Sequence, residues 1–358
     1  MRLFDLGGMY MQTQKLETER LILRKLKLED ENEVFNNWTS DDEVSKYVRW
    51  STHKSIEDTR EYLNNAMETY KKEQNAEWGI VLKETNELIG AIGCFFNDKE
   101  KRYEIGYNIS RKQWRNGYTT EALKRVMDYL INVEHITSFI CSHAKDNPAS
   151  GAVMKKAGFK YVKDATYEKF DKSQKFDCRV YYFDTIKLVK PTKEHKNQLI
   201  EYKMEHFNNG EKIIHACSRW DKMDNYEEWL KLLKDCSNKE TVSKDWTVST
   251  EFLGIREKDN RIVGMISIRH ELTNDFLKNY AGHIGYGVRP TERRKGYVTQ
   301  MLNQALKYCK DELKLDKVMI SCDKKNEGSR KTILNAGGIL EKEYTKDGEE
   351  VQIYWINL

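Results

Sequence analysis

Two short basic segments, each with one glycine, hold the residues whose types and spacing best suit binding chemistry. Residues 111–119 read RKQWRNGYT and residues 293–299 read RRKGYVT, and a helical pattern follows each glycine. The start of a helix exposes unpaired N–H groups and about half a positive charge, and glycine lets the backbone approach a ligand closely. Nearby arginine and lysine neutralise phosphate oxygens. The segments therefore predict one diphosphate site each, although a solvated basic turn is an equally good interpretation of either segment alone.

Other binding and catalytic motifs are absent from the sequence. It contains neither GxxxxGK[ST] nor GxGxxG, the glycine-rich motifs of nucleoside-triphosphate and dinucleotide sites. Its eight histidines include no HxxxH or HExxH pair, and no two cysteines form CxxC. We therefore expect no metal site and no nucleoside triphosphate or dinucleotide ligand.

Both basic segments lie in a stretch of sequence that recurs after 179 residues, half the length of the 358-residue chain. Three special positions recur at this offset: Gly106 and Gly285, Gly117 and Gly296, and Asn147 and Asn326. Because a single domain usually has roughly 100 to 200 residues, a repeat of this size predicts two similar domains. We place them at residues 14–187 and 188–358, with residues 186–189 able to end the first sheet or to begin the second.

Each copy predicts the same order of elements around its basic segment. Two strands come first, then the glycine turn and a long helix, then a third strand and a second helix. The expected strands are 88–96, 104–109 and 136–141 in the first copy, and 262–268, 283–288 and 317–322 in the second. The long helices carry apolar residues at i, i+3 and i+4 spacing, so each should bury one face. Asn147 and Asn326 are expected to be the N-caps of the second helices.

The composition indicates a globular protein that has neither nucleic acid nor membrane as a partner. Lysine and arginine number 61 against 57 acidic residues, and the net charge of +4 is too small to attract a polyanion. No run of about 18 uncharged apolar residues occurs, and residues 1–14 lack the apolar stretch of a signal peptide. Seven cysteines, an odd number without CxxC spacing, indicate buried free thiols in a reducing compartment. We therefore expect a soluble cytoplasmic protein.

The two basic segments resemble the acyl-CoA motif of the GNAT superfamily of N-acetyltransferases. That motif is (Gln/Arg)-x-x-Gly-x-(Gly/Ala) at the start of the long helix after the fourth strand. In the second copy Arg293 and Gly296 match it, while Val298 departs from it. The first copy departs at both ends, where Trp114 and Thr119 stand.

The resemblance covers nearly the whole of each half of the chain. Residues 114–123, WRNGYTTEAL, and residues 16–24, LETERLILR, resemble ribosomal-protein alanine N-acetyltransferases. Residues 249–355 resemble a separate group of predicted GNAT acetyltransferases. The resemblance implies an α+β fold of two tandem GNAT domains, each with a mixed, mostly antiparallel sheet flanked by helices.

The same resemblance implies acetyl-CoA as cosubstrate and direct acetyl transfer to a primary amine, on a protein N-terminus or on a small molecule. The pantetheine arm of the coenzyme would lie between the splayed fourth and fifth strands and bond to the fourth like an added strand. The implied partner is a peptide or small-molecule amine, and monomer and homodimer both remain open. The implied cofactor-binding residues are Ile109, Arg111, Arg115, Asn116, Gly117, Tyr118, Thr119 and Asn147 in the first copy, and Val288, Arg293, Arg294, Lys295, Gly296, Tyr297, Val298, Asn326 and Ser329 in the second.

Glu104 and His283 occupy the strand position where the family often carries a general base. A histidine with a pKa of about 6.5 can take a proton directly, whereas a glutamate at about 4.3 needs a raised pKa or a bridging water. A solvated or hydrogen-bonded strand residue is the alternative for each. The family's usual tyrosine acid is replaced by Met154 and Ile333, so another hydroxyl must serve or the thiolate leaves unaided.

Two alternatives to this function remain open. The irregular motif around Trp114 and Thr119 is also compatible with one half that binds CoA, or regulates the other half, without catalysis. An aminoglycoside-type antibiotic acetyltransferase would share the coenzyme chemistry and differ only in its acceptor. Acidic residues around the acceptor cleft would favour such cationic acceptors, or polyamines.

Overall fold

The computed structural model describes residues 11–71, 75–346 and 348–358. The chain divides after Asp184 into two compact units, which we call unit 1 and unit 2. The predicted boundary between residues 187 and 188 falls inside strand β9 (Ile186–Val189), which pairs antiparallel with β10 (Ser249–Arg256) of unit 2. Residues 186–189 therefore begin the second sheet.

Unit 1 contains a mixed sheet of eight strands in the order β1-β2-β3-β4-β5-β6-β8-β7. The strands are β1 (Leu16–Glu17), β2 (Leu21–Arg24), β3 (Asn75–Leu82), β4 (Leu88–Asn97), β5 (Arg102–Ile109), β6 (Ser138–Ala144), β7 (Lys160–Glu168) and β8 (Lys175–Asp184). Every neighbouring pair is antiparallel except β5 and β6, which run parallel. The register of β5 with β6 ends at Glu104 and Ile140, so beyond this point the two strands part.

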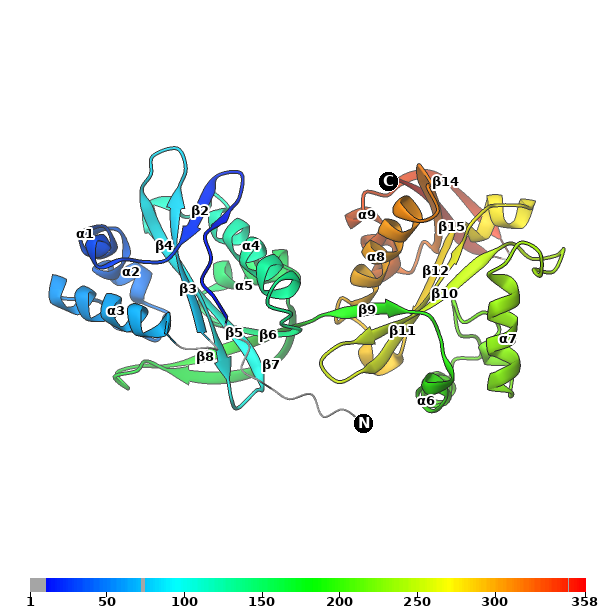
Figure 1. Ribbon diagram of the computed structural model, residues 1–358, viewed down its shortest axis with the longest axis horizontal. Coiled ribbons are helices and arrows are strands. Elements are labelled where there is room, and N and C mark those ends of the chain that lie inside the picture. Colours follow the sequence, from blue (N-terminus) through cyan, green and yellow to red (C-terminus); the bar gives the residue numbers. More distant parts are fainter. Residues whose placement is uncertain (1–10, 72–74, 347) are drawn as a thin grey trace. The chain divides into compact units, whose positions relative to one another are not determined.

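Helices cover both faces of the sheet of unit 1. Figure 1 shows α1 (Glu31–Val34), α2 (Asp42–Ser45) and α3 (Ile56–Thr69) on one face, and α4 (Tyr118–Asn132) and α5 (Pro148–Lys156) on the other. The apolar stripe expected on the long helix is buried: Leu123 and Val126 share one hydrophobic cluster with Ile105 of β5. A second cluster joins Trp38 and Leu63 to Ala91 of β4 on the opposite face. Alternate residues of the strands thus serve two separate cores.

The strands of unit 2 form two sheets, ordered β12-β11-β10-β9 and β13-β15-β14. The strands not yet given are β11 (Arg261–Arg269), β12 (Ile284–Val288), β13 (Lys317–Asp323), β14 (Ile339–Lys346) and β15 (Glu349–Asn357). Their pairs are antiparallel, and the two sheets meet at an isolated bridge between Gly282 and Ile320. This meeting point corresponds to the parting of β5 and β6 in unit 1.

The helices of unit 2 repeat the arrangement of unit 1. Figure 1 shows α8 (Tyr297–Asp311) and α9 (Glu327–Asn335) on one side of the strands, and α6 (Lys196–Asn208) and α7 (Tyr226–Cys236) on the other. Two hydrophobic clusters, one for each helix pair, lie on opposite faces of β10 and β11. The predicted fold, two α+β domains with mostly antiparallel sheets, is confirmed.

The cysteines and the helices bear on the expected cellular compartment. All seven cysteines are free and buried, which agrees with the expectation of reduced thiols. Within residues 11–71, 75–346 and 348–358, no helix is long and apolar enough to cross a membrane. The expectation that the start of the chain is not a signal peptide concerns mainly residues 1–10, which lie outside the described residues.

Candidate active site

Each predicted glycine turn forms the N-terminus of a long helix. Gly117 is the N-cap of α4 with a φ of 83°, and Gly296 is the N-cap of α8 with a φ of 84°. Arg115 and Arg294, two residues earlier, also have positive φ angles of 68° and 64°. Glycine suits this left-handed cap, and having no side chain it leaves the first-turn N–H groups to a ligand. The two turns therefore have the same backbone geometry, which suits an anion.

The side chains around the first turn agree with a phosphate ligand. A Cβ added at Gly117 would lie 3.6 Å from Nη2 of Arg20, whose guanidinium stacks 4.5 Å from the centre of the Tyr118 ring. Glu121 holds Arg20 in this place through a 2.6 Å ion pair. Arg20 lies within residues 16–24, where the sequence analysis noted a resemblance without giving this residue a role.

Several predicted phosphate ligands also hold the turns in shape. Arg111 pairs with Asp41 at 3.0 Å, and Lys295 pairs with Glu292 at 2.9 Å. Arg115 and Arg294 are exposed beside the helix start. These two arginines are consequently the best placed of the predicted cations to reach a diphosphate.

The departure of Trp114 from the motif has a structural explanation. The indole N–H of Trp114 donates to the carbonyl of Ile109 at 3.0 Å, and Nε of Arg293 donates to the carbonyl of Val288 at 3.2 Å. Trp114 and Arg293 thus make equivalent hydrogen bonds to the last residues of β5 and β12. The carbonyls of Ile109 and Val288 already accept these bonds. A coenzyme donor at either residue would therefore have to share the carbonyl with Trp114 or Arg293.

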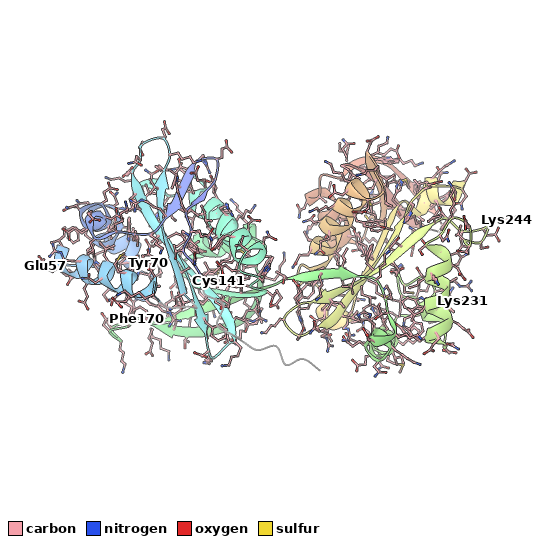
Figure 2. The ribbon with its side chains drawn as sticks, viewed as in Figure 1. Glu57, Tyr70, Cys141, Phe170, Lys231 and Lys244 are labelled. Atoms are coloured by element: carbon pink, nitrogen blue, oxygen red, sulfur yellow. The ribbon has the colours of Figure 1, made fainter. Side chains whose placement is uncertain are left out.

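The parted strands of unit 1 provide an edge for the coenzyme arm. Cys141 of β6, labelled in Figure 2, donates its S–H to the carbonyl of Ile105 at 3.3 Å, where the gap begins. Beyond it, Oδ1 of Asn108 is buried and has no hydrogen-bond partner among the described residues. A buried acceptor without a partner is costly, so this oxygen marks a place where a ligand donor would be bound favourably.

Asn147 and Asn326 are N-caps, as expected. Their Oδ1 atoms accept from the backbone N–H of Ser150 at 3.3 Å and of Ser329 at 3.1 Å. The serine hydroxyls in turn contact tyrosines of β5 and β12. The hydroxyl of Tyr107 lies 3.1 Å from that of Ser150, and the hydroxyl of Tyr286 lies 2.7 Å from that of Ser329. These contacts tie strand to helix in both units, so Ser329 has a structural partner beside its predicted coenzyme contact.

The two predicted bases differ in their surroundings. Glu104 accepts from the Asn97 amide at 2.6 Å and lies 4.0 Å from Arg49. His283 is buried, and its Nδ1 accepts from the backbone N–H of Met319 at 3.0 Å. Burial lowers the pKa of His283 to about 4, aided by the positive charge of Arg269. In such a neutral ring Nε2 carries the hydrogen, so His283 must lose its bond to Met319 before Nδ1 can take a proton.

A cavity of about 980 Å³ in unit 1 connects the parted strands with α3. Part of its rim is the turn between β7 and β8, where Phe170 is labelled in Figure 2. This turn is fastened to the segment before α3, because the N–H of Phe170 donates to the carbonyl of Arg49 at 2.7 Å. The cavity lining is strongly acidic, since one guanidinium, that of Arg49, stands among five carboxyl groups: Asp58, Glu61, Glu77, Glu104 and Asp171.

A carboxyl group occupies the same row of the sheet in both units. Glu77, Gly93 and Gly106 are cross-strand neighbours on β3, β4 and β5. Glu251, Ser267 and Gly285 form the matching row on β10, β11 and β12. Neither glutamate was predicted from the sequence, because the two lie 174 residues apart and so do not match at the 179-residue offset of the repeat. A register of strands, which the sequence does not give, was needed to find them.

Burial shapes the acidity of both carboxyl groups. It raises the pKa of Glu77, which accepts from the hydroxyl of Tyr62 at 2.6 Å. It raises the pKa of Glu251 to about 8, even though Ser218 donates to this carboxyl. Glu251 is 5% exposed, and its Oε1 has no hydrogen-bond partner among the described residues.

The faces of β5 and β12, the strands that correspond to the fourth strand of the family's fold, are covered differently. A Cβ at Gly106 would approach nothing closer than Phe95, at 4.0 Å. In unit 2 a Cβ at Gly287 would lie 2.8 Å from the carbonyl oxygen of His215, and one at Gly285 would lie 3.7 Å from Ala216. The segment of residues 214–219 therefore lies against β12 on the side where unit 1 has its cavity.

Comparison with known proteins identifies the family. The model of the acetyltransferase (GNAT) domain matches residues 20–160 and again residues 186–339. The chain belongs to the GNAT family of acetyltransferases. The tandem arrangement predicted from the repeat is confirmed, and so is the expected enzyme class, an acyltransferase.

Each of the similar proteins below matches about half of this chain, which is the length of one GNAT domain. An uncharacterized N-acetyltransferase of Bacillus subtilis, YoaA, is 32% identical over 177 residues, which are 49% of this chain and 97% of YoaA. An uncharacterized N-acetyltransferase of Bacillus licheniformis, p20, is 30% identical over 48% of this chain and 96% of its own length. A solved GNAT acetyltransferase of Bacillus anthracis is 26% identical, with a TM-score of 0.41, over 48% of this chain and 98% of its own.

Proposed function

We propose that unit 1 transfers the acetyl group of acetyl-CoA directly to a primary amine held in its acidic cavity. One observation carries the proposal: the glycine turn before α4, the parted edge of β5 and the cavity of about 980 Å³ occur together in this unit. When bound, acetyl-CoA supplies an acetyl thioester that an amine can attack without a covalent enzyme intermediate.

The residues of unit 1 divide the work between binding and proton transfer. The N-terminus of α4, with Arg115 and Arg20 beside it, would neutralise the diphosphate. The edge of β5 from Ile105 to Ile109 and the partnerless Oδ1 of Asn108 would align the arm. Met154 lines the cavity at the family's tyrosine position and cannot donate a proton, so the thiolate would leave without a side-chain acid there.

The acidic lining supports a cationic acceptor. Five carboxyl groups against one guanidinium attract an ammonium group and repel acidic substrates. Protein N-termini, polyamines and aminoglycosides all meet this requirement. A turnover screen with acetyl-CoA and these three classes would separate them, and the buried free thiols support a cytoplasmic location for the reaction.

We propose a second role for unit 2, which is to bind acetyl-CoA without turning it over. Its glycine turn repeats the geometry of the first, which supports coenzyme binding. Residues 214–219 lie against β12 where the acceptor would enter. This coverage favours the alternative in which one half serves as a binding or regulatory domain.

Calorimetry with acetyl-CoA tests the binding part of the proposal. We compare Gly117→Asp with Gly117→Asn, and Gly296→Asp with Gly296→Asn, because asparagine tolerates a positive φ and lacks the charge that repels phosphate. The wild-type chain should bind two equivalents, and each aspartate variant should lose one while its asparagine partner keeps it. Binding that survives both aspartate substitutions together would refute the two sites.

A further inference from the structure

The row of Glu77, Gly93 and Gly106 leads from the acidic cavity to the open edge of β5. Gly93 and Gly106 carry no side chains, and an added Cβ at Gly93 would meet nothing closer than 3.6 Å. Gly106 lies two residues beyond Glu104, where the register with β6 ends, so this row meets β5 inside the gap. A group at Glu77 therefore faces the coenzyme edge across two glycines.

Glu77 is held in place by one hydrogen bond that leaves it able to accept another. The hydroxyl of Tyr62 on α3 donates to Oε1 at 2.6 Å. A carboxylate has two oxygens, so an ammonium group can be bound while the tyrosine bond persists. The side chain lines the cavity, which gives an acceptor access to it.

We propose that Glu77 binds the acceptor's ammonium group and removes one proton from it, so that the neutral amine can attack the acetyl carbon. This inference rests on the proposed function of unit 1 and adds a catalytic residue to it. Glu77 is also one of the five carboxyl groups that favour a cationic acceptor.

The proton balance of the step is complete. The ammonium loses one proton to the Glu77 carboxylate, and this proton passes to solvent. The nitrogen lone pair forms the C–N bond, the C–S bond then breaks, and its electron pair leaves on sulfur. The amide nitrogen loses a second proton, which the thiolate takes up to give the thiol. One acetyl group is transferred and one proton is released for each turnover.

Glu104 is less well placed for this task. Its row contains Asn75 and Phe95, so an aromatic side chain stands where Gly93 stands beside Glu77. The Asn97 amide and Arg49 already contact its carboxylate. Burial raises the pKa of Glu77, which makes its carboxylate a stronger base than an ordinary one.

Other titratable groups line the cavity around Glu77. They include Asp58, Glu61 and Tyr62 on α3, Glu104 on β5, Asp171 in the turn between β7 and β8, and Arg49 and His53 on the segment before α3. Burial lowers the pKa of His53, so it adds no charge at neutral pH. The lining thus keeps its negative charge where an ammonium group would enter.

The test compares Glu77→Gln with Glu57→Gln, a control on the exposed start of α3 that Figure 2 labels, and with Glu104→Gln. Spermidine is the acceptor probe, and kcat/KM and acetyl-CoA affinity are measured on the whole chain across pH. Glu77→Gln should lower kcat/KM by about 100-fold or more and remove the loss of activity at low pH, because it deletes a general base. Acetyl-CoA affinity should not change.

A second variant guards against a merely structural effect of Glu77→Gln. The Tyr62 bond lowers the pKa of Glu77, so Tyr62→Phe should move the low-pH limb of kcat/KM to higher pH while activity persists. Full activity in Glu77→Gln, or loss of the low-pH limb in Glu104→Gln alone, would overturn the inference. So would a wild-type chain that binds acetyl-CoA and neither binds nor acetylates spermidine. Failure to bind acetyl-CoA would instead refute the proposed function.

Discussion

The two units share the glycine turn proposed to bind the coenzyme and differ on the proposed acceptor side. The caps at Gly117 and Gly296 have nearly the same φ, and Trp114 and Arg293 donate to matching strand-end carbonyls. In unit 1 the face of β5 opens into an acidic cavity, whereas residues 214–219 lie against β12 in unit 2. The comparison teaches that the proposed coenzyme side depends on a short motif, while the proposed acceptor side depends on segments that are distant from it in the sequence.

The matched carboxyl groups sharpen this comparison. Glu77 lines a cavity and accepts a hydrogen bond from Tyr62. Glu251 is buried and accepts a hydrogen bond from Ser218, while its Oε1 has no hydrogen-bond partner among the described residues. The same row of the sheet thus carries a carboxyl group that lines a cavity in unit 1 and a buried carboxyl group in unit 2. Substitutions at Gly117, Gly93, Glu251 and Trp114 test the difference.

The largest effect should follow from blocking the first turn. Gly117→Asp should lower acetyl transfer by about 1,000-fold or more, because a carboxylate beside the helix start repels the diphosphate needed for alignment. Gly117→Asn is the matched control and should keep most activity. Steady-state turnover measures both, and a smaller loss in Gly117→Asp than in Gly296→Asp would reverse the roles of the units.

Filling the row in unit 1 should have the next largest effect. Gly93→Val places a side chain between Glu77 and Gly106, so kcat/KM for the amine should fall by about 10- to 100-fold as access narrows. Acetyl-CoA affinity, measured by calorimetry, should stay the same. Gly93→Ser imitates Ser267 of unit 2 and should show a smaller loss. Equal loss of coenzyme affinity would show that the row belongs to the coenzyme site instead.

Replacing Glu251 should change stability and leave turnover intact. Its pKa of about 8 lies above the ordinary value of 4.5, so its contribution to stability is complete below pH 4.5 and is lost as pH rises through 8. Glu251→Gln should therefore stabilise unit 2 by about 3 kcal/mol near pH 8 and have little effect near pH 5. Thermal unfolding at both pH values measures this. A variant less stable than wild type at both would contradict the burial of an ionisable acid there.

The smallest effect should come from exchanging the strand-end donors. Trp114→Arg restores the family residue and keeps an N–H donor for the Ile109 carbonyl, so acetyl-CoA affinity should change little. Trp114→Leu removes the donor and should weaken binding by about 5- to 10-fold, the effect of losing one hydrogen bond. Calorimetry distinguishes the two variants. Equal affinities for Trp114→Leu and wild type would show that this bond does not shape the turn.

The sequence predicted most of the coenzyme side because its signals are local. The helix caps at Asn147 and Asn326, the glycine turns before α4 and α8, and the apolar stripes of these two helices all follow from neighbouring residues. The sequence left open whether residues 186–189 end the first sheet or begin the second, because they have the same strand pattern as the end of β8. Their partners, not their composition, assign them to different units.

The acceptor side could not be predicted because it depends on contacts between distant segments. The equivalence of Trp114 and Arg293 rests on a shared carbonyl partner rather than on similar chemistry. The importance of Glu77 appears only when the strand register places it beside Gly93 and Gly106. His283 matches the family position in sequence, yet its bond to Met319 depends on β13.

A single-turnover experiment tests most directly whether the two units divide coenzyme binding from catalysis. The chain is loaded with two equivalents of acetyl-CoA, mixed with spermidine, and the bound thioester is followed over time by mass spectrometry. We predict that one equivalent is consumed rapidly and the other remains. Consumption of both at the same rate would contradict the account.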